Sequence, residues 1–218
     1  MRKILLAIIT ASLFVISSNA QIKKGSLFLG GDISGSSQKT KTDGITTDKQ
    51  SGISISPVIG KAIKDNFVLG LTAGVGFYDV TNSIFNLDYK SNTYTAGVFL
   101  RKYKNIGTSG FYIFVQGSLN GAFFKQKADV PPSSPASDEK RIIFVGLTAY
   151  PGISYAIGKK LHLETGFNNL LLLNYRNEKR EIGDPVVSVQ KTKGFDISSS
   201  LNNATSSLYL GFRLLIGK

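Results

Sequence analysis

The chain has 218 residues and carries 26 Lys and Arg against 14 Asp and Glu, a net charge of +12. It has no Cys and one His, which excludes a disulfide framework and thiol chemistry and leaves little material for a metal site. Its 23 Gly, 9 Tyr and 14 Phe are typical of close-packed strands with aromatic ends and not of a helical protein.

Residues 1–20 have the three parts of a secretory signal peptide. Arg2 and Lys3 precede an apolar core, and a small-residue cleavage site ends at Ala20. The apolar core is shorter than the ~20 residues that a spanning helix needs, so we expect cleavage and a single mature domain at 21–218. Export argues against nucleic acid as the partner of the basic surface, and makes lipopolysaccharide phosphates its natural anionic neighbour. Because the basic residues are scattered along the sequence, a set of charged, solvated loops is the favoured interpretation.

The mature sequence contains eight segments in which apolar residues recur at every second position. In the third, the odd positions from Phe67 to Phe77 are apolar, whereas the even positions hold mainly Gly and Thr. This period of two indicates strands with one apolar face, and not helices. The predicted strands cover residues 26–34, 51–60, 67–78, 92–103, 111–124, 141–157, 161–175 and 207–217.

A closed barrel is the architecture that these strands favour. In lipid every backbone N–H and C=O must be paired internally, and the mature chain has no apolar run long enough for a spanning helix. Most of the strands approach or exceed the ~9–11 residues that a tilted spanning strand needs. The fold class that we predict is therefore all-β, an eight-stranded antiparallel up-and-down transmembrane β-barrel.

The connections between the predicted strands alternate in length, as short periplasmic turns and longer extracellular loops do in outer-membrane barrels. Both termini then fall on the periplasmic side. Residues 170–173 form an unbroken apolar run inside the seventh strand, which suggests a bulge. Residues 185–190 are β-prone and either extend a hairpin beyond the membrane or contribute to a ninth and tenth strand. The short connections cover 61–66, 104–110 and 158–160, and the long ones cover 36–50, 79–91, 125–140 and 176–203.

Aromatic residues gather at the outward-facing ends of the predicted strands. Two such girdles mark the membrane interfaces of outer-membrane barrels. The predicted periplasmic girdle contains Phe67, Phe111 and Tyr155, and the predicted outer girdle contains Phe77, Tyr94 and Phe123.

Four polar residues are predicted to face the lumen at one height. Glu164 lies early in the upward seventh strand and Arg213 late in the downward eighth strand, so the two should meet near the periplasmic end. A buried charge needs a partner, which predicts a Glu164–Arg213 contact. Arg101 and His162 fall in the same layer and are expected at the edge of this network.

Three segments resemble small outer-membrane β-barrel families common in Bacteroidetes. Residues 56–70 resemble their hairpin between strands two and three, and residues 150–164 match a "PG-x-x-Y … K-x-L-x-L-E" hairpin between strands six and seven. Residues 99–103 resemble an "F-x-R-Y-Y" ending of strand four. The resemblance implies an OmpA-type eight-stranded barrel of the porin family and no single activity. The chain departs from many such barrels because it ends in Gly217-Lys218 and not in an aromatic residue, although Phe212 lies nearby.

Two motifs could carry chemistry. His162 and Glu164 share a strand face and could belong to a metal site or to a Ser-His-Glu triad, as in lipid A deacylases. Their place near a periplasmic turn disfavours this role, because lipid A lies in the outer leaflet. The glycines at 70, 74 and 76 keep strand parity and do not open a helix, so they do not form a nucleotide loop.

The leading functional hypothesis is a non-enzymatic integral component of the outer membrane, with no cofactor or metal. Its expected partners are outer-membrane lipids and lipopolysaccharide, the barrel-assembly machinery during insertion, and an extracellular or periplasmic protein that binds its loops. An eight-stranded interior is about filled by its own side chains, which argues against a wide solute channel. The second hypothesis is therefore a narrow or gated pore for small solutes. A lipid A-modifying enzyme is the third.

Overall fold

The computed structural model describes residues 22–42, 45–82, 87–129, 138–158, 160–167, 170–183, 186–199 and 208–217. The predicted signal peptide and its cleavage site lie outside these residues. No helix in the described part of the chain is long and apolar enough to cross a membrane. The strands are β1 (Leu27–Thr42), β2 (Ile45–Lys64), β3 (Phe67–Asn82), β4 (Leu87–Ile106), β5 (Phe111–Asp129), β6 (Asp138–Ile157), β7 (Leu161–Phe167), β8 (Leu171–Ile182), β9 (Ser188–Ser198) and β10 (Leu208–Ile216).

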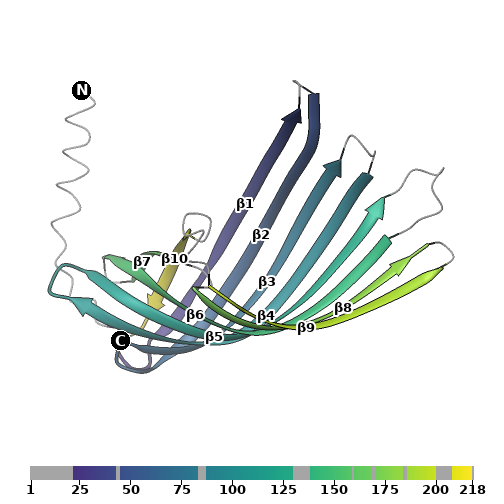
Figure 1. Cartoon of the computed structure of the whole chain (residues 1–218). Helices are drawn as coiled ribbons and strands as arrows, with labels where there is room; N and C mark the ends of the chain where they lie inside the picture. Colours follow the sequence, from purple (N-terminus) through teal and green to yellow (C-terminus); the bar gives the residue numbers. More distant parts are fainter. Residues whose placement is uncertain are drawn as a thin grey trace, which may run out of the picture.

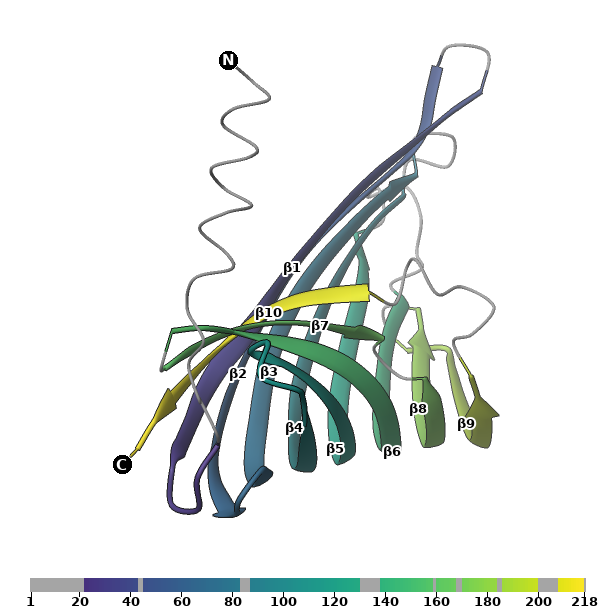
Figure 2. The same cartoon turned by 90° about the vertical axis from the view of Figure 1, so that its left-hand side faces the viewer.

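Eight antiparallel strands close into a ring, which confirms the predicted barrel. Each strand from β1 to β6 pairs with the next, β6 pairs with β7, β7 with β10, and β10 with β1. The closing pairing joins residues 27–31 of β1 to residues 212–216 of β10. Figure 2 shows β7 and β10 running across the front of the other strands to complete this ring.

The alternation of faces follows the sequence pattern. Leu71 of β3 is 57% exposed, whereas the flanking residues Gly70 and Thr72 are buried or half-buried. Leu210 of β10 is 61% exposed between half-buried Tyr209 and buried Gly211. The odd positions of β3 and the even positions of β10 therefore form the outer wall, as expected for strands with a lipid face and a lumen face.

The continuous seventh strand that the sequence predicts is divided into β7 and β8, whereas the predicted eighth strand is the single strand β10. Gly152 of β6 pairs with Gly166 of β7, but Ala149 pairs with Leu171 of β8, two residues later than a regular ladder would place its partner. The apolar run at 170–173 begins β8 at this point. Because the shift is an even number of residues, β8 keeps the outward parity of β7.

The last long connection is also different from the prediction. Most of the predicted loop 176–203 is strand, since β8 continues to Ile182 and pairs with β9 along its whole length. Residues 188–190 are the first residues of β9, which forms a hairpin with β8. The β-prone segment therefore extends a hairpin, and β9 is a strand segment in addition to the eight strands of the ring. Beyond Gly31, the described part of β1 pairs with β2 alone, and β9 pairs with β8 alone. Figure 1 shows β1 and β9 as the two outer strands of the curved sheet at this end.

The first three long connections are shorter than predicted because the strands continue beyond the membrane-spanning pattern. β1 and β2 pair from Leu27–Lys61 to Thr42–Ile45. β4 pairs with β5 as far as Asp129, and β6 begins at Asp138. The sequence missed these extensions because their outward residues are polar, so the apolar alternation ends before the hydrogen-bonded ladder does.

The aromatic residues of the two predicted girdles lie at two heights on the barrel wall. At the short-turn end the rings of Phe111 and Tyr155 have centroids 4.6 Å apart on paired strands. At the upper height, below the strand extensions, Tyr94 lies opposite Phe123, and Phe77 lies two residues further along the neighbouring strand. These three side chains of the outer girdle are exposed by 38–50%.

The lumen has two different halves. Near the short turns it is packed with buried apolar side chains, and the rings of Phe28 and Phe99 are 5.9 Å apart. The packed residues include Phe28, Val68, Phe99, Tyr103, Tyr112 and Phe114. Above this layer a cavity of about 620 Å³ faces the long-loop end. We call this cavity the cup.

Candidate functional site

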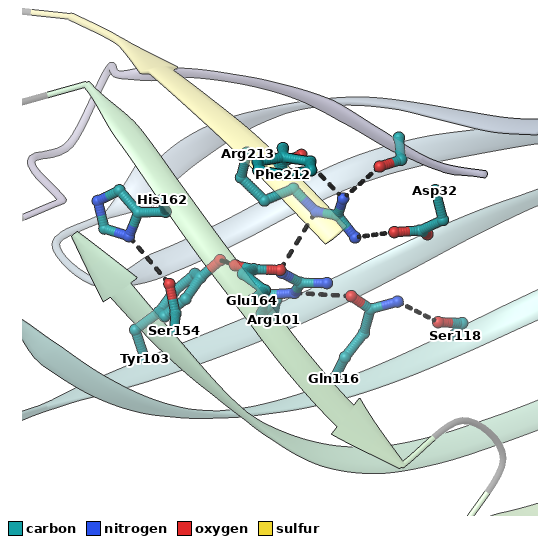
Figure 3. Close-up of polar contacts among 11 residues, drawn as sticks. Asp32, Arg101, Tyr103, Gln116, Ser118, Ser154, His162, Glu164, Phe212 and Arg213 are labelled. Carbon is teal, nitrogen blue, oxygen red and sulfur yellow. Dashed lines mark hydrogen bonds and ion pairs between the residues drawn. The ribbon is translucent and has the colours of Figure 1, made fainter. Parts of the chain in front are cut away.

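Buried charges lie between the packed layer and the cup. Figure 3 shows the polar contacts that they make. Arg101 of β4 reaches across the lumen and donates from Nη1 to Oε2 of Glu164 on β7, at 2.5 Å. The second carboxylate oxygen of Glu164 accepts a hydrogen bond of 2.6 Å from the hydroxyl of Tyr103. Both charged side chains are almost fully buried, so each depends on the other for compensation.

Arg213 of β10 supplies a second cation to the same carboxylate. Its Nε lies 3.2 Å from Oε2 of Glu164, as an ion pair without hydrogen-bond geometry. Its Nη1 donates to the backbone carbonyl oxygens of Gly31 and Phe212, and its Nη2 donates to Asp32, each at 3.0 Å. The sequence placed Glu164 and Arg213 together, and the structure brings them into contact. We call Arg101, Glu164 and Arg213 the lumen triad.

Aromatic rings surround the guanidinium of Arg101. Its Cζ lies 4.3 Å from the ring centroid of Phe114, and 5.3–5.8 Å from the centroids of Phe28, Phe99 and Tyr103. Rings at this distance attract a cation through their quadrupoles, and more strongly when water is absent. The lumen triad is thus held between an aromatic layer on one side and the cup on the other.

The structure changes the predicted place of two residues. Arg101 lies at the centre of the network and not at its edge, because it bonds Glu164, Tyr103 and the side chain of Gln116. His162 lies in the same layer, but its hydrogen bond goes to Ser154 at 3.0 Å and not to Glu164. Its ring packs against Tyr112, with centroids 5.5 Å apart.

Three partners of the lumen triad were missed in the sequence, although each has some signal there. Tyr103 follows Arg101 by two residues and therefore shares its face, and Gln116 lies directly opposite Arg101 on β5. Asp32 faces inward by parity, but its contact with Arg213 is visible only when the closing β1–β10 register is known. Contacts across the lumen, such as Arg101–Glu164, have no local sequence signal.

Ser154, His162 and Glu164 lack the geometry of a hydrolase triad. A triad needs one ring nitrogen of His on the serine and the other on the carboxylate. Here Nδ1 of His162 faces Ser154, and Nε2 is buried with no hydrogen-bond partner among the described residues. Glu164 is occupied by the two arginines, and Ser154 is fully buried, so a substrate could not reach it.

The described residues contain no group of three His, Cys, Asp or Glu side chains that could hold a metal ion. The cup is the polar cavity inside the barrel. Asp32, Tyr150 and Tyr209 line part of its wall. The rest is mainly small neutral polar side chains, which are Ser34, Ser54, Ser56, Thr72, Ser118, Asn120 and Thr148. Its floor is formed by Arg101, Arg213 and Gln116, so the lumen triad closes the cup toward the short-turn end.

Solved structures of outer-membrane proteins are similar to this chain. The outer membrane protein OprG from Pseudomonas aeruginosa aligns with a TM-score of 0.54 at 18% identity, over 92% of this chain and 100% of that one. A major outer membrane protein from Thermus thermophilus aligns with a TM-score of 0.51 at 11% identity, over 88% and 99%. No family model and no curated protein matches the sequence. The closed ring of eight strands and these two likenesses together show that the chain has the fold of an outer-membrane β-barrel.

Proposed function

We propose that the chain is a non-enzymatic integral barrel of the bacterial outer membrane, whose lumen is closed on the periplasmic side by the lumen triad. The observation that carries this proposal is the buried contact of Glu164 with Arg101 and Arg213 beneath the cup. The three charges compensate one another, and the carboxylate of Glu164 is engaged by both arginines and by Tyr103, so it is not available as a general base or a ligand. The proposed role is structural, with the long-loop end available to an extracellular partner.

The sequence motifs at 56–70, 99–103 and 150–164 support a finer assignment to the small OmpA-type, porin-family barrels of Bacteroidetes. We propose the partners that this assignment implies: outer-membrane lipids and lipopolysaccharide in the membrane, and the barrel-assembly machinery during insertion. The proposed route is export, with cleavage after Ala20.

Fractionation tests the location. The mature protein is expected to start near Gln21 and to sediment with outer membranes, because the strands expose a continuous apolar wall. Unboiled samples should migrate differently from boiled samples on a denaturing gel, since a closed barrel resists the detergent until it is heated. Recovery in the soluble periplasmic fraction would contradict the membrane assignment.

A narrow or gated pore is the second candidate, and the polar cup is the observation that favours it. We expect the wild-type protein to show no discrete conductance steps in planar bilayers, because charges and rings fill the lumen below the cup. A variant with Arg101→Ser, Glu164→Ser and Arg213→Ser removes the lumen triad and leaves only Asp32, which is partly exposed, without its arginine. Because the buried rings of the packed layer remain, this variant should show no discrete steps either. Stable wild-type conductance would favour the pore and would contradict the closed lumen.

A further inference from the structure

The outer wall carries a row of like charges that a stable sheet ordinarily avoids. Lys125 of β5 lies directly opposite Arg141 of β6, and Arg141 lies opposite Lys179 of β8. Lys179 in turn lies opposite Lys191 of β9. Like charges at directly opposite positions destabilise a sheet, so four in one row indicate that this surface has a role other than stability.

This row lies on the lipid-facing side of the wall. Arg141 shares its face with Ile143, Val145 and Leu147, which are 48–53% exposed, whereas Ile142 between them is buried. The row therefore continues the outer surface of the barrel and does not face the cup.

The row of four cations lies at the height of the outer membrane interface. Phe123 of the outer girdle is paired with Ile143, one row below Lys125 and Arg141. Rows on one face are two residues apart, about 6.6 Å along the strand. Cations just above an aromatic girdle lie at the level of lipid headgroups.

Neighbouring rows extend the charge. Lys193 lies one row below Lys191 on β9, and Lys127 lies one row above Lys125 on β5. Two carboxylates, Glu139 and Glu181, share this face, so six cations against two acids leave a net charge of +4. We call this surface the basic patch, and its cations are Lys125, Lys127, Arg141, Lys179, Lys191 and Lys193.

The two carboxylates compensate the patch only in part. Glu139 contacts Arg141 at 2.5 Å, Lys125 at 3.3 Å and Lys127 at 3.5 Å. Partial burial acts to raise the pKa of Glu139, but hydrogen bonds from Arg141 and Lys125 outweigh it and hold that pKa below its usual value. Glu139 is thus charged and shared among three cations. Glu181 contacts Lys179 at 2.6 Å and Arg141 at 3.8 Å. Lys191 has no ion pair within the described part of the chain.

A hollow lies beside the patch, on the β4 side. It has a volume of about 420 Å³ and is lined by Lys90, Asn92, Lys125, Lys127 and Ala128. Amine and amide groups around such a hollow can donate several hydrogen bonds to a phosphate or to a sugar hydroxyl.

We propose that the basic patch binds the phosphate groups of a phosphorylated outer-leaflet lipid of the lipid A class. The patch supplies a net positive surface at headgroup height, and the apolar wall below it, including Val145, Leu147 and Phe195, receives the acyl chains. An amphiphile with an anionic headgroup contacts both the basic patch and the apolar wall, whereas a soluble anion contacts only the basic patch. The inference rests on the proposed membrane orientation, with the long-loop end facing outward.

Native mass spectrometry of the full-length mature protein in detergent tests the proposal without depending on cellular location. The patch variant combines Lys125→Gln, Arg141→Gln, Lys179→Gln and Lys191→Gln. The control variant removes four exposed cations at the short-turn end, by Lys61→Gln, Lys64→Gln, Lys102→Gln and Lys104→Gln. Heat-modifiable migration verifies that each variant is folded before lipid is added.

Bisphosphorylated lipid A is expected to bind the patch variant at least about tenfold more weakly than wild type, because each cation near an anionic surface contributes about a fivefold gain. The control variant should bind within about twofold of wild type, well below the fivefold contribution of a single engaged cation. Dephosphorylated lipid A, which has the same acyl chains, should bind all three proteins equally weakly.

Equal loss in the patch and control variants would show that only total charge matters and would overturn the proposal. Full displacement of lipid A by inorganic phosphate would overturn the lipid as ligand and leave a site for free anions. Should the protein prove periplasmic while lipid A still binds through the patch, the proposed location would fail and the binding site would stand.

Discussion

The Glu164→Gln variant is expected to lose about 3–5 kcal/mol of unfolding free energy, because the change leaves two buried arginines without their shared carboxylate. Arg101 would keep only neutral partners, and Arg213 would keep Asp32, which is partly exposed. The loss is measured by urea titration in detergent micelles, followed by circular dichroism and by the heat-modifiable gel band.

A rim ion pair provides the matched control. Arg180 and Asp138 form a two-bond contact at 2.5 and 2.8 Å near the start of β6, but the arginine is largely exposed. Asp138→Asn should therefore cost less than about 1 kcal/mol. Adding Arg101→Met to Glu164→Gln should recover part of the loss, because an apolar side chain tolerates the buried position better than an unpaired charge. Equal, small effects of Glu164→Gln and Asp138→Asn would contradict a buried network.

The Leu71→Arg variant is expected to be destabilised by about 2–4 kcal/mol, as a cation at the bilayer midplane is. Leu71 points outward on β3, between Phe67 of the periplasmic girdle and Phe77 of the outer girdle. The free energy of unfolding is measured in lipid vesicles and not in detergent, because the cost depends on how deep the charge lies in the hydrocarbon core of a bilayer.

Thr81→Arg on the same strand and the same face is the control for depth. Thr81 lies beyond Phe77 and opposite Asp88, outside the outer girdle, where an added cation costs only about 0–1 kcal/mol. If both variants are destabilised equally, the girdles do not mark the membrane boundaries and the assignment of the spanning segments is wrong.

The fold was largely predictable from the sequence because a barrel strand repeats its faces every two residues. The alternation from Phe67 to Phe77 locates β3 and its lipid face without any knowledge of its neighbours. The division of the seventh strand was not predictable in the same way, because the apolar run at 170–173 has no alternation. Which part of β6 each half pairs with depends on the whole register.

The candidate site was predictable only where its members lie on adjacent strands. Glu164 and Arg213 could be brought together because β7 and β10 are neighbours whose heights follow from the turns. Arg101 comes from β4, on the other side of the lumen, and its reach to Glu164 depends on side-chain length and packing. The basic patch escaped notice because its cations are scattered in sequence and become a row only through the pairing of β5, β6, β8 and β9.

Single-cysteine labelling of intact cells tests the central claim most directly, since the chain has no Cys of its own. Thr72→Cys lines the cup, Leu71→Cys faces lipid, and Val68→Cys lies in the packed layer beneath the lumen triad. The closed outer-membrane barrel predicts that a small membrane-impermeant maleimide modifies Thr72→Cys from outside the cell and leaves the other two unmodified until the protein is unfolded. Rapid modification of Val68→Cys, or modification of Leu71→Cys in place of Thr72→Cys, would contradict the closed lumen or the assignment of the two faces.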